Sequence, residues 1–206
     1  MEQTHKQEFF SAKNIAKIGI LTALAYVLYM FVKFPLPMLF PAFLDIQFSD
    51  LPALIGGFAM GPWAGCLIVI VKCLLKMPFT GTACVGEIAD IIMGIAFVLP
   101  SALIYKKYKN KKSALLGVLV GAVCCIIASV LANWLLLIPF FVEVMFQGSW
   151  DPLVNMVSGI YANVTPANFY TYYIFLGVVP FNILRCAIVV ILTFLLYKRV
   201  SPILHR

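Results

Sequence analysis

Apolar residues form five long runs along the chain, and short polar or charged segments separate these runs. The runs cover residues 14–32, 51–75, 84–105, 113–142 and 170–197. Each is close to or above the length of about 20 residues that an α-helix needs to cross a bilayer. The pattern predicts an all-α integral membrane protein, with residues 1–206 forming a single membrane domain in the lipid bilayer.

The positions of the basic residues change the predicted number of helices. Eleven of the 15 lysines and arginines form three clusters, which the positive-inside rule places in the cytoplasm. The clusters are Lys6, Lys13 and Lys17; Lys106, Lys107, Lys109, Lys111 and Lys112; and Lys198, Arg199 and Arg206. If residues 51–75 formed one helix, the second cluster would face the opposite side from the first. Two crossings within residues 51–75 place all three clusters on the same side of the membrane. The chain is therefore predicted to have six transmembrane helices, with both termini in the cytoplasm.

A glycine and a proline mark the boundary between these two crossings. Gly61-Pro62 is unfavourable inside a helix and favourable in a turn. Each half is about 15 residues and about 22 Å long, shorter than the hydrocarbon thickness of about 30 Å. Such short helices suit the wall of a cavity better than a lipid-facing surface. The predicted spans are 14–32, 48–61, 62–76, 84–105, 113–142 and 170–197.

Composition excludes several classes of function. The chain is 63% hydrophobic and 11% charged, which is too apolar for a soluble enzyme. Its net charge of +7 lies mainly in the predicted cytoplasmic segments and does not indicate nucleic-acid binding. The cysteines lack metal-ligand spacing, both histidines lie in the terminal tails, and the sequence has no phosphate-binding loop. We therefore expect no catalytic residues, metal site, resident cofactor or ATPase activity.

Two of the predicted external segments carry candidate ligand contacts. Residues 33–48 are apolar and contain three prolines, so they form either a lid over a ligand or a stiff loop at the lipid headgroups. In residues 76–84, hydroxyl groups and glycine precede a helix that carries Glu87 and Asp90 on one face. Helix capping accounts for Glu87, but Asp90 lies deeper and needs a partner or water.

Polar residues also interrupt the last two predicted helices. Asn133 and Trp134 interrupt one, and Asn182 and Arg185, which share a face, interrupt the other. Arg185 lies about a dozen residues before the final basic cluster and therefore near the middle of the membrane. It either faces a ligand or forms an ion pair with Asp90 or Glu87. The predicted ligand contacts are Phe43, Leu44, Asp45, Thr80, Gly81, Thr82, Glu87, Asp90, Asn133, Trp134, Asn182 and Arg185.

Small residues recur at a spacing of four in two helices. Gly117 and Gly121 predict close approach of a neighbouring helix. In the first helix, the same spacing serves either internal packing or a partner protein. The residues there are Ala12, Ala16, Gly19 and Ala23.

Several motifs together resemble the riboflavin-specific substrate-binding component, or S-component, of energy-coupling factor (ECF) transporters. They are Ser49-Asp-Leu-Pro-Ala-Leu-Ile-Gly56, Gly61-Pro62, Lys72-x-Leu-Leu75, Thr80-Gly-Thr82, Val85-Gly-Glu87, Ile104-Tyr-Lys-Lys107, Asn133, Pro180-Phe-Asn182 and Tyr197-Lys-Arg199. The resemblance implies a six-helix, multi-pass protein of a prokaryotic plasma membrane that captures riboflavin at its external face. It also implies a transmembrane coupling subunit and two ATPase subunits as partners.

The resemblance assigns roles to individual residues. Family binding positions carry over to Asn133 and Asn182, and the loop after the first helix acts as the gate. The small residues of the first helix would contact the coupling subunit.

Three positions depart from the family pattern, which usually has asparagine at Cys73 and Asp90 and lysine at Arg185. An arginine fork suits a phosphate, so flavin mononucleotide (FMN) or another vitamin is an alternative ligand. A further alternative is a carrier that acts alone, coupled to protons or ions, with Glu87, Asp90 and Arg185 as the relay.

Overall fold

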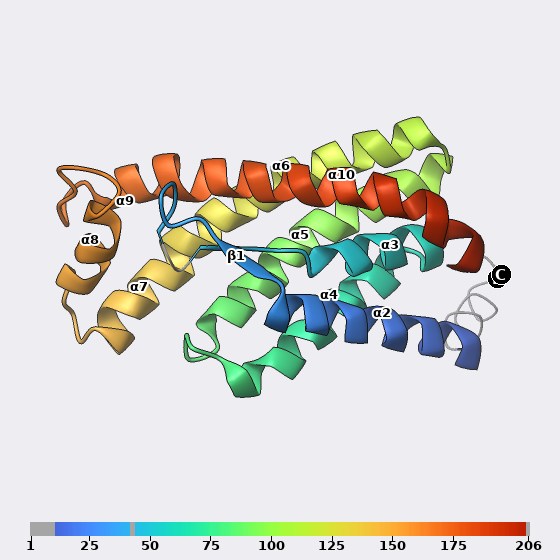
Figure 1. Ribbon diagram of the computed structural model, residues 1–206, viewed down its shortest axis with the longest axis horizontal. Coiled ribbons are helices and arrows are strands. Elements are labelled where there is room, and N and C mark those ends of the chain that lie inside the picture. Colours follow the sequence, from blue (N-terminus) through green and yellow to red (C-terminus); the bar gives the residue numbers. More distant parts are fainter. Residues whose placement is uncertain (1–10, 42–43, 205–206) are drawn as a thin grey trace.

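The computed structural model describes residues 11–41 and 44–204 of the chain, and it shows helices that run mainly along one long axis (Figure 1). The long helices are α2 (Ala12–Phe31), α4 (Pro62–Lys76), α5 (Val85–Tyr108), α6 (Lys111–Ala132) and α10 (Val179–Leu204). The shorter elements are β1 (Lys33–Pro35), β2 (Asp45–Gln47), α3 (Asp50–Met60), a 3₁₀ turn (Met77–Phe79), α7 (Ile138–Phe140), α8 (Asp151–Ser158) and α9 (Phe169–Tyr172).

The predicted break at Gly61-Pro62 is present between α3 and α4. Gly61 has φ of +102°, a conformation that favours glycine, and its N–H donates to the Gly57 carbonyl. Pro62 occupies the first turn of α4, where a missing N–H costs nothing. A Cβ atom at Gly65 would lie 2.9 Å from the carbonyl oxygen of Ala53, so the glycine lets the two helices pack closely.

The two helices beside this break differ in length. The described part of the chain has five helical stretches that are long and apolar enough to cross a membrane: Ala12–Phe31, Pro62–Phe79, Val85–Tyr108, Lys111–Met145 and Phe169–Leu196. Helix α3 has only 11 residues and a length of about 16 Å, so it is shorter than the predicted span 48–61. It is short because the preceding residues belong to the extended strand β2.

The prediction of an all-α fold is wrong for residues 33–35 and 45–47, which form two strands. Strands β1 and β2 pair antiparallel, with Lys33 opposite Gln47 and Pro35 opposite Asp45. After β1 the chain turns at residues 37–39, where the N–H groups of Leu39 and Phe40 donate to the Leu36 carbonyl. The buried ring of Phe40 packs edge-on against Phe181 of α10, with ring centroids 5.4 Å apart.

Two long helices contain π-helical turns at comparable depths. One helix runs from α6 through π turns at Asn133–Leu137 and Phe141–Met145, and the other enters α10 through a π turn at Tyr173–Val178. Pro139 and Pro180 lie in these regions and cannot donate the usual backbone hydrogen bond. The carbonyl groups released in this way become available to side chains.

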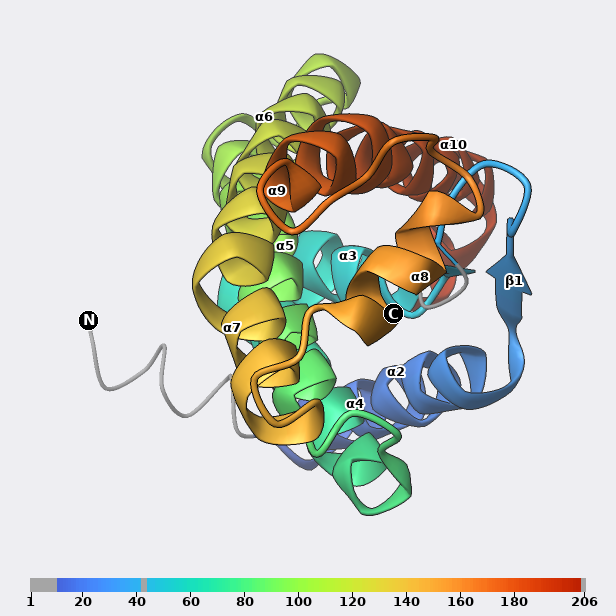
Figure 2. The same ribbon diagram turned by 90° about the vertical axis from the view of Figure 1, so that its left-hand side faces the viewer.

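The two ends of the molecule have different character. Helices α8 and α9 lie at one end, where α8 lies across the bundle and packs into an apolar cluster with α7 and the Tyr173–Val178 turn (Figure 2). The start of α2, the connection between α5 and α6 and the last turns of α10 lie together at the other end (Figure 1). These three segments belong to the three basic regions of the sequence, so the described parts of these regions lie at a single end.

The predicted close approach at Gly117 and Gly121 is confirmed, because both glycines lie against α5. A Cβ atom at Gly121 would overlap the Ser101 side chain and the Phe97 carbonyl group. We expect Gly121→Ala to destabilise the fold by about 1–3 kcal/mol through overpacking. The measurement is the thermal unfolding midpoint of the purified protein in detergent.

Gly19→Ala is the matched control for this change. Gly19 is also a helical glycine, but nothing lies within 4 Å of the position that a Cβ atom would take there. Alanine favours helix, so this control should leave the midpoint unchanged or raise it. Equal losses for the two variants would contradict the packing explanation.

Candidate ligand-binding site

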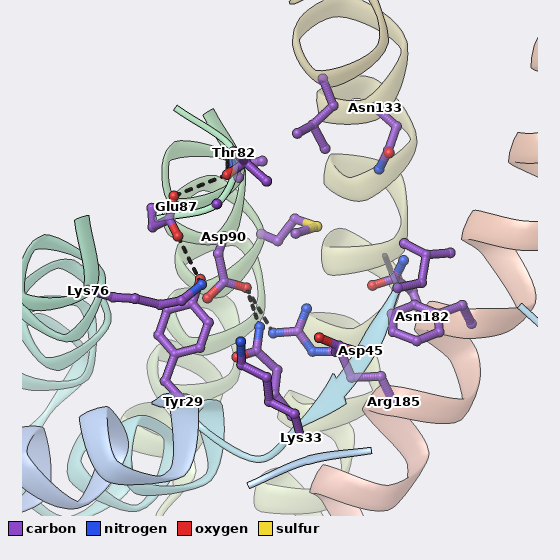
Figure 3. A pocket seen from close by; sticks show the side chains of 18 of the residues that line it. Tyr29, Lys33, Asp45, Lys76, Thr82, Glu87, Asp90, Asn133, Asn182 and Arg185 are labelled. Atoms are coloured by element: carbon purple, nitrogen blue, oxygen red, sulfur yellow. Dashed lines mark hydrogen bonds and ion pairs between the residues drawn. The ribbon is translucent and has the colours of Figure 1, made fainter. Parts of the chain in front are cut away.

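A cavity of about 340 Å³ lies among the β1–β2 hairpin, the ends of α2 and α4, the first turns of α5, and the π-helical regions (Figure 3). Nine predicted ligand contacts line it: Leu44, Asp45, Gly81, Thr82, Glu87, Asp90, Asn133, Asn182 and Arg185. These residues come from four separate segments of the sequence, 44–45, 81–90, 133 and 182–185. The fold therefore brings most of the predicted polar residues to one place.

Two other predicted contacts, Thr80 and Trp134, do not line the cavity. Thr80 lies behind it, and its hydroxyl donates to Glu87 at 2.7 Å. Trp134 is 53% exposed and projects away, because consecutive helical residues point in different directions. Phe43 lies outside the described residues.

Sequence reasoning did not assign a binding role to several lining residues. The apolar and aromatic ones are Tyr29, Met93, Leu137, Phe141, Tyr173 and Phe181, and the polar ones include Lys33, Gln47 and Lys76. The aromatic residues carry no signal in the sequence that separates a cavity wall from a lipid-facing surface. Lys33 and Lys76 did carry a signal in the sequence, because they lie outside the three basic clusters.

Four buried charged side chains beside the cavity form a closed network, which we call the charge ring. Asp50 bonds Lys72 Nζ through Oδ1 and Arg185 Nη2 through Oδ2, each at 2.6 Å. Asp90 lies 3.4 Å from Lys72 Nζ through Oδ2 and 3.0 Å from Arg185 Nη2 through Oδ1. Two carboxylates and two cations alternate, so the charge ring is formally neutral. Of the alternatives left open for Arg185, the ion pair with Asp90 is present, and Asp50 is a second partner.

Neutral polar groups complete the contacts of the charge ring. Lys72 donates to the Ser49 hydroxyl at 2.6 Å, Ser49 donates to the side-chain Oε1 of Gln47 at 3.2 Å, and the side-chain amide of Gln47 donates to Asp90 at 3.2 Å. The three N–H bonds of Lys72 thus have three partners, although its side chain is fully buried. Such complete pairing is what permits charges to lie in an apolar interior.

A second ion pair lies on the neighbouring wall. Lys76 Nζ lies 2.8 Å from Glu87 Oε1 and 4.0 Å from the ring centre of Tyr29. Glu87 also accepts from the hydroxyl of Thr80. The hydroxyl of Thr82 accepts from the Gly86 N–H, which satisfies one free donor in the first turn of α5.

The two asparagines at the cavity wall are held in the same way. Asn133 donates to the Ser129 carbonyl and Asn182 to the Val178 carbonyl, four residues earlier and both at 2.8 Å. The Asn133 Oδ1 accepts from the Tyr173 hydroxyl at 2.7 Å. The Asn182 Oδ1 is buried and has no hydrogen-bond partner in the described structure. An unpaired buried acceptor is costly, so this atom is suited to an N–H or O–H donor of a ligand.

A tyrosine links the segment after β1 to the π turn that precedes α10. The Tyr161 hydroxyl lies 3.0 Å from the Leu39 carbonyl oxygen and 2.8 Å from the Leu176 carbonyl oxygen. Leu176 precedes Pro180 by four residues, so Pro180 cannot donate the usual helical bond to it. Burial raises the pKa of Tyr161, which keeps its hydroxyl protonated as a donor.

The site combines aromatic walls with a few fixed polar groups, an arrangement typical of small-molecule binding. Among residues 11–41 and 44–204, no three or more histidine, cysteine, aspartate or glutamate side chains are grouped to hold a metal ion. The geometry is thus suited to a flat, partly apolar ligand with polar groups along its edge.

The charge ring predicts a large difference between two neighbouring lysines. Lys72→Met would leave two buried carboxylates with one cation, and breaking a buried pair costs about 3–5 kcal/mol. Lys76→Met should cost less, because Glu87 keeps its threonine contact and faces the cavity. The measurement is the thermal unfolding midpoint of each variant in detergent. Equal decreases in the midpoint would argue against the charge ring as the stronger constraint.

Comparison with known proteins agrees with this geometry. Residues 13–197 match the family described as ECF transporter, substrate-specific component. The chain is 32% identical over 194 residues to the riboflavin transporter RibU of Staphylococcus aureus (strain TCH60), covering 94% of this chain and 93% of that protein. It is 26% identical over 193 residues to the riboflavin transporter FmnP of Bacillus subtilis (strain 168), covering 92% and 93%.

A solved structure of the S component of a bacterial ECF transporter has the same fold. It superposes with a TM-score of 0.69 and 31% sequence identity, and the match covers 93% of this chain and 97% of that one. The family and these relatives are transport proteins rather than enzymes. The chain therefore belongs to the family of substrate-specific components of ECF transporters.

Proposed function

We propose that this protein binds riboflavin from the external side of the membrane and delivers it inward with an ATP-hydrolysing partner module. The observation that carries the proposal is the unpaired Asn182 Oδ1 in a cavity with aromatic walls. The isoalloxazine ring of riboflavin is flat and has an imide N–H on its polar edge, which can donate to this oxygen. The names of the two relatives support the same ligand.

The other cavity residues suit the remaining parts of riboflavin. The rings of Tyr29, Phe141 and Phe181 offer apolar surface to the flavin ring. Arg185 can donate to the ring carbonyl oxygens, and Thr82 and Asp45 can bond the ribityl hydroxyls. A cavity of about 340 Å³ also falls within the usual range for small-molecule sites.

Charge balance favours riboflavin over FMN. Arg185 is neutralised by Asp50 and Asp90, and Lys76 by Glu87, so neither cation is free to balance a phosphate. Lys33 at the hairpin has no anionic partner among the described residues, and it is the cation that could favour FMN as the second candidate. A buried phosphate with a single counter-charge is costly.

We also propose six membrane crossings, with both termini in the cytoplasm of a prokaryotic cell. Helix α3 and the residues of β2 together form the short second crossing. The support is the gathering of the basic segments at one end of the molecule, which the positive-inside rule assigns to the cytoplasm. The cavity and the hairpin would then lie toward the outside.

The small residues of α2 form the proposed contact with the coupling subunit. Ala12, Ala16, Gly19 and Ala23 are all exposed, and small side chains allow close helix approach. Two ATPase subunits complete the proposed complex. A carrier that acts alone has less support, because its proposed relay residues Glu87, Asp90 and Arg185 are already paired with one another or with lysine.

Direct titration tests the ligand. Purified protein should quench riboflavin fluorescence with tight binding, bind FMN more weakly and leave an unrelated vitamin such as thiamine unbound. Asn182→Ala should raise the Kd for riboflavin by about tenfold or more, the value of one hydrogen bond in a desolvated site. Absence of flavin binding by the unmodified protein would overturn the proposed function.

Thr193→Val is the matched control for Asn182→Ala. Thr193 is also buried on α10, and its hydroxyl donates to a backbone carbonyl four residues earlier. It does not line the cavity. Its replacement should leave the Kd unchanged, which would separate loss of a ligand contact from general damage to α10.

A bulky residue on α2 tests the proposed coupling surface. Ala16→Trp should leave riboflavin binding intact and abolish ATP-dependent uptake into vesicles that contain the complete transporter. Uptake driven by a pH gradient in vesicles holding this protein alone would instead support the independent carrier.

A further inference from the structure

We propose that Asp50 and Lys72, neither of which lines the cavity, are positioning residues that hold Arg185 in the orientation needed to contact the ligand. The inference rests on the proposed function, since it concerns how the same cavity recognises a flavin ring. Asp50 lies at the start of α3, Lys72 in α4 and Arg185 in α10. The charge ring therefore connects the binding site to the broken helix pair behind it.

The contacts of Arg185 divide its guanidinium group into two parts. Both ion pairs use Nη2, which bonds Asp50 and Asp90. Its Nη1 and Nε have no hydrogen-bond partner among the described residues, and neither atom is fully buried. Because Arg185 lines the cavity, these N–H groups remain available to a ligand.

Asp50 is better placed than Asp90 to fix this orientation. Its oxygen lies 2.6 Å from Nη2, and its side chain is only 2% exposed. Asp90 lies at 3.0 Å, and the same oxygen also accepts from Gln47. Asp90 further lines the cavity, so a ligand competes for its contacts, whereas Asp50 lies outside the ligand's reach.

Lys72 in turn fixes Asp50. It binds the other Asp50 oxygen at 2.6 Å, and its amine is itself held by Ser49. A long arginine side chain loses considerable conformational freedom when it binds, unless other contacts have already ordered it. The chain of contacts from Ser49 through Lys72 and Asp50 to Arg185 orders the arginine side chain before the ligand binds. A substitution at Asp50 should therefore weaken binding, although Asp50 does not contact the ligand.

The decisive variant removes both supporting charges together. Asp50→Asn with Lys72→Gln keeps the charge ring neutral and retains the Asp90–Arg185 pair. We expect its thermal midpoint to recover relative to Asp50→Asn alone, while its riboflavin Kd stays about tenfold above that of the unmodified protein, within the range for coupled neighbours. Asp151→Asn with Lys112→Gln is the control, because it removes one charge of each sign at exposed positions.

A double-mutant cycle identifies the residue through which the pair acts. In an Arg185→Lys background, the Asp50→Asn and Lys72→Gln changes should alter the Kd by less than about threefold. A lysine has a single nitrogen and therefore no second N–H group that must be oriented toward the ligand. Equal losses in the two backgrounds would overturn the inference. So would an unchanged Kd in the neutral pair variant once its midpoint has recovered.

Asp50→Glu covers the case in which the neutral pair variant does not fold. It keeps both ion pairs possible but moves the carboxylate by one methylene group, and it should raise the Kd while preserving most of the stability. A well-folded Asp50→Glu protein with unchanged affinity would overturn the inference. If the unmodified protein binds no flavin, the proposed function fails first, and this inference fails with it.

Discussion

The alternation of two carboxylates and two cations in the charge ring is the constraint on which the rest of the site depends. Each carboxylate uses its two oxygens on two different cations, so removing any single member of the ring leaves an uncompensated charge. The ring also joins helices that are distant in sequence, because its members come from α3, α4, α5 and α10. Because an unpaired charge is costly in an apolar interior, the complete pairing specifies how these helices pack against one another.

The departures from the family pattern become one structural feature when they are placed in the fold. Asp90 contacts Arg185 at 3.0 Å, and the Cys73 thiol lies 3.7 Å from the other oxygen of Asp90. Compared with the asparagine that the resemblance implies, Asp90 adds a negative charge beside Arg185, whereas arginine in place of lysine leaves the positive charge unchanged. An arginine that could have recognised phosphate is thereby neutralised, which explains why its presence does not by itself indicate FMN.

Much of the fold followed from the sequence, because helix length, charge clusters and Gly61-Pro62 are local signals. Five of the nine predicted cavity residues, Glu87, Asp90, Asn133, Asn182 and Arg185, were predictable because polar groups within apolar helices need a partner. The rest depended on information that a linear pattern lacks. Trp134 is adjacent to a lining residue but projects differently, and Tyr29 resembles any other aromatic residue in an apolar run. Asp50 resembled an ordinary first-turn acid, so its role in the charge ring required the three-dimensional arrangement.

Tyr161 links two parts of the molecule because its hydroxyl lies between two carbonyl groups. Its single proton is shared between the Leu39 oxygen at 3.0 Å and the Leu176 oxygen at 2.8 Å. Leu176 lies in the π turn before α10, and Pro180 cannot donate the usual helical bond to its carbonyl group. The phenol therefore replaces a donor that the proline removes. The same side chain tethers the segment between the two strands to that helix.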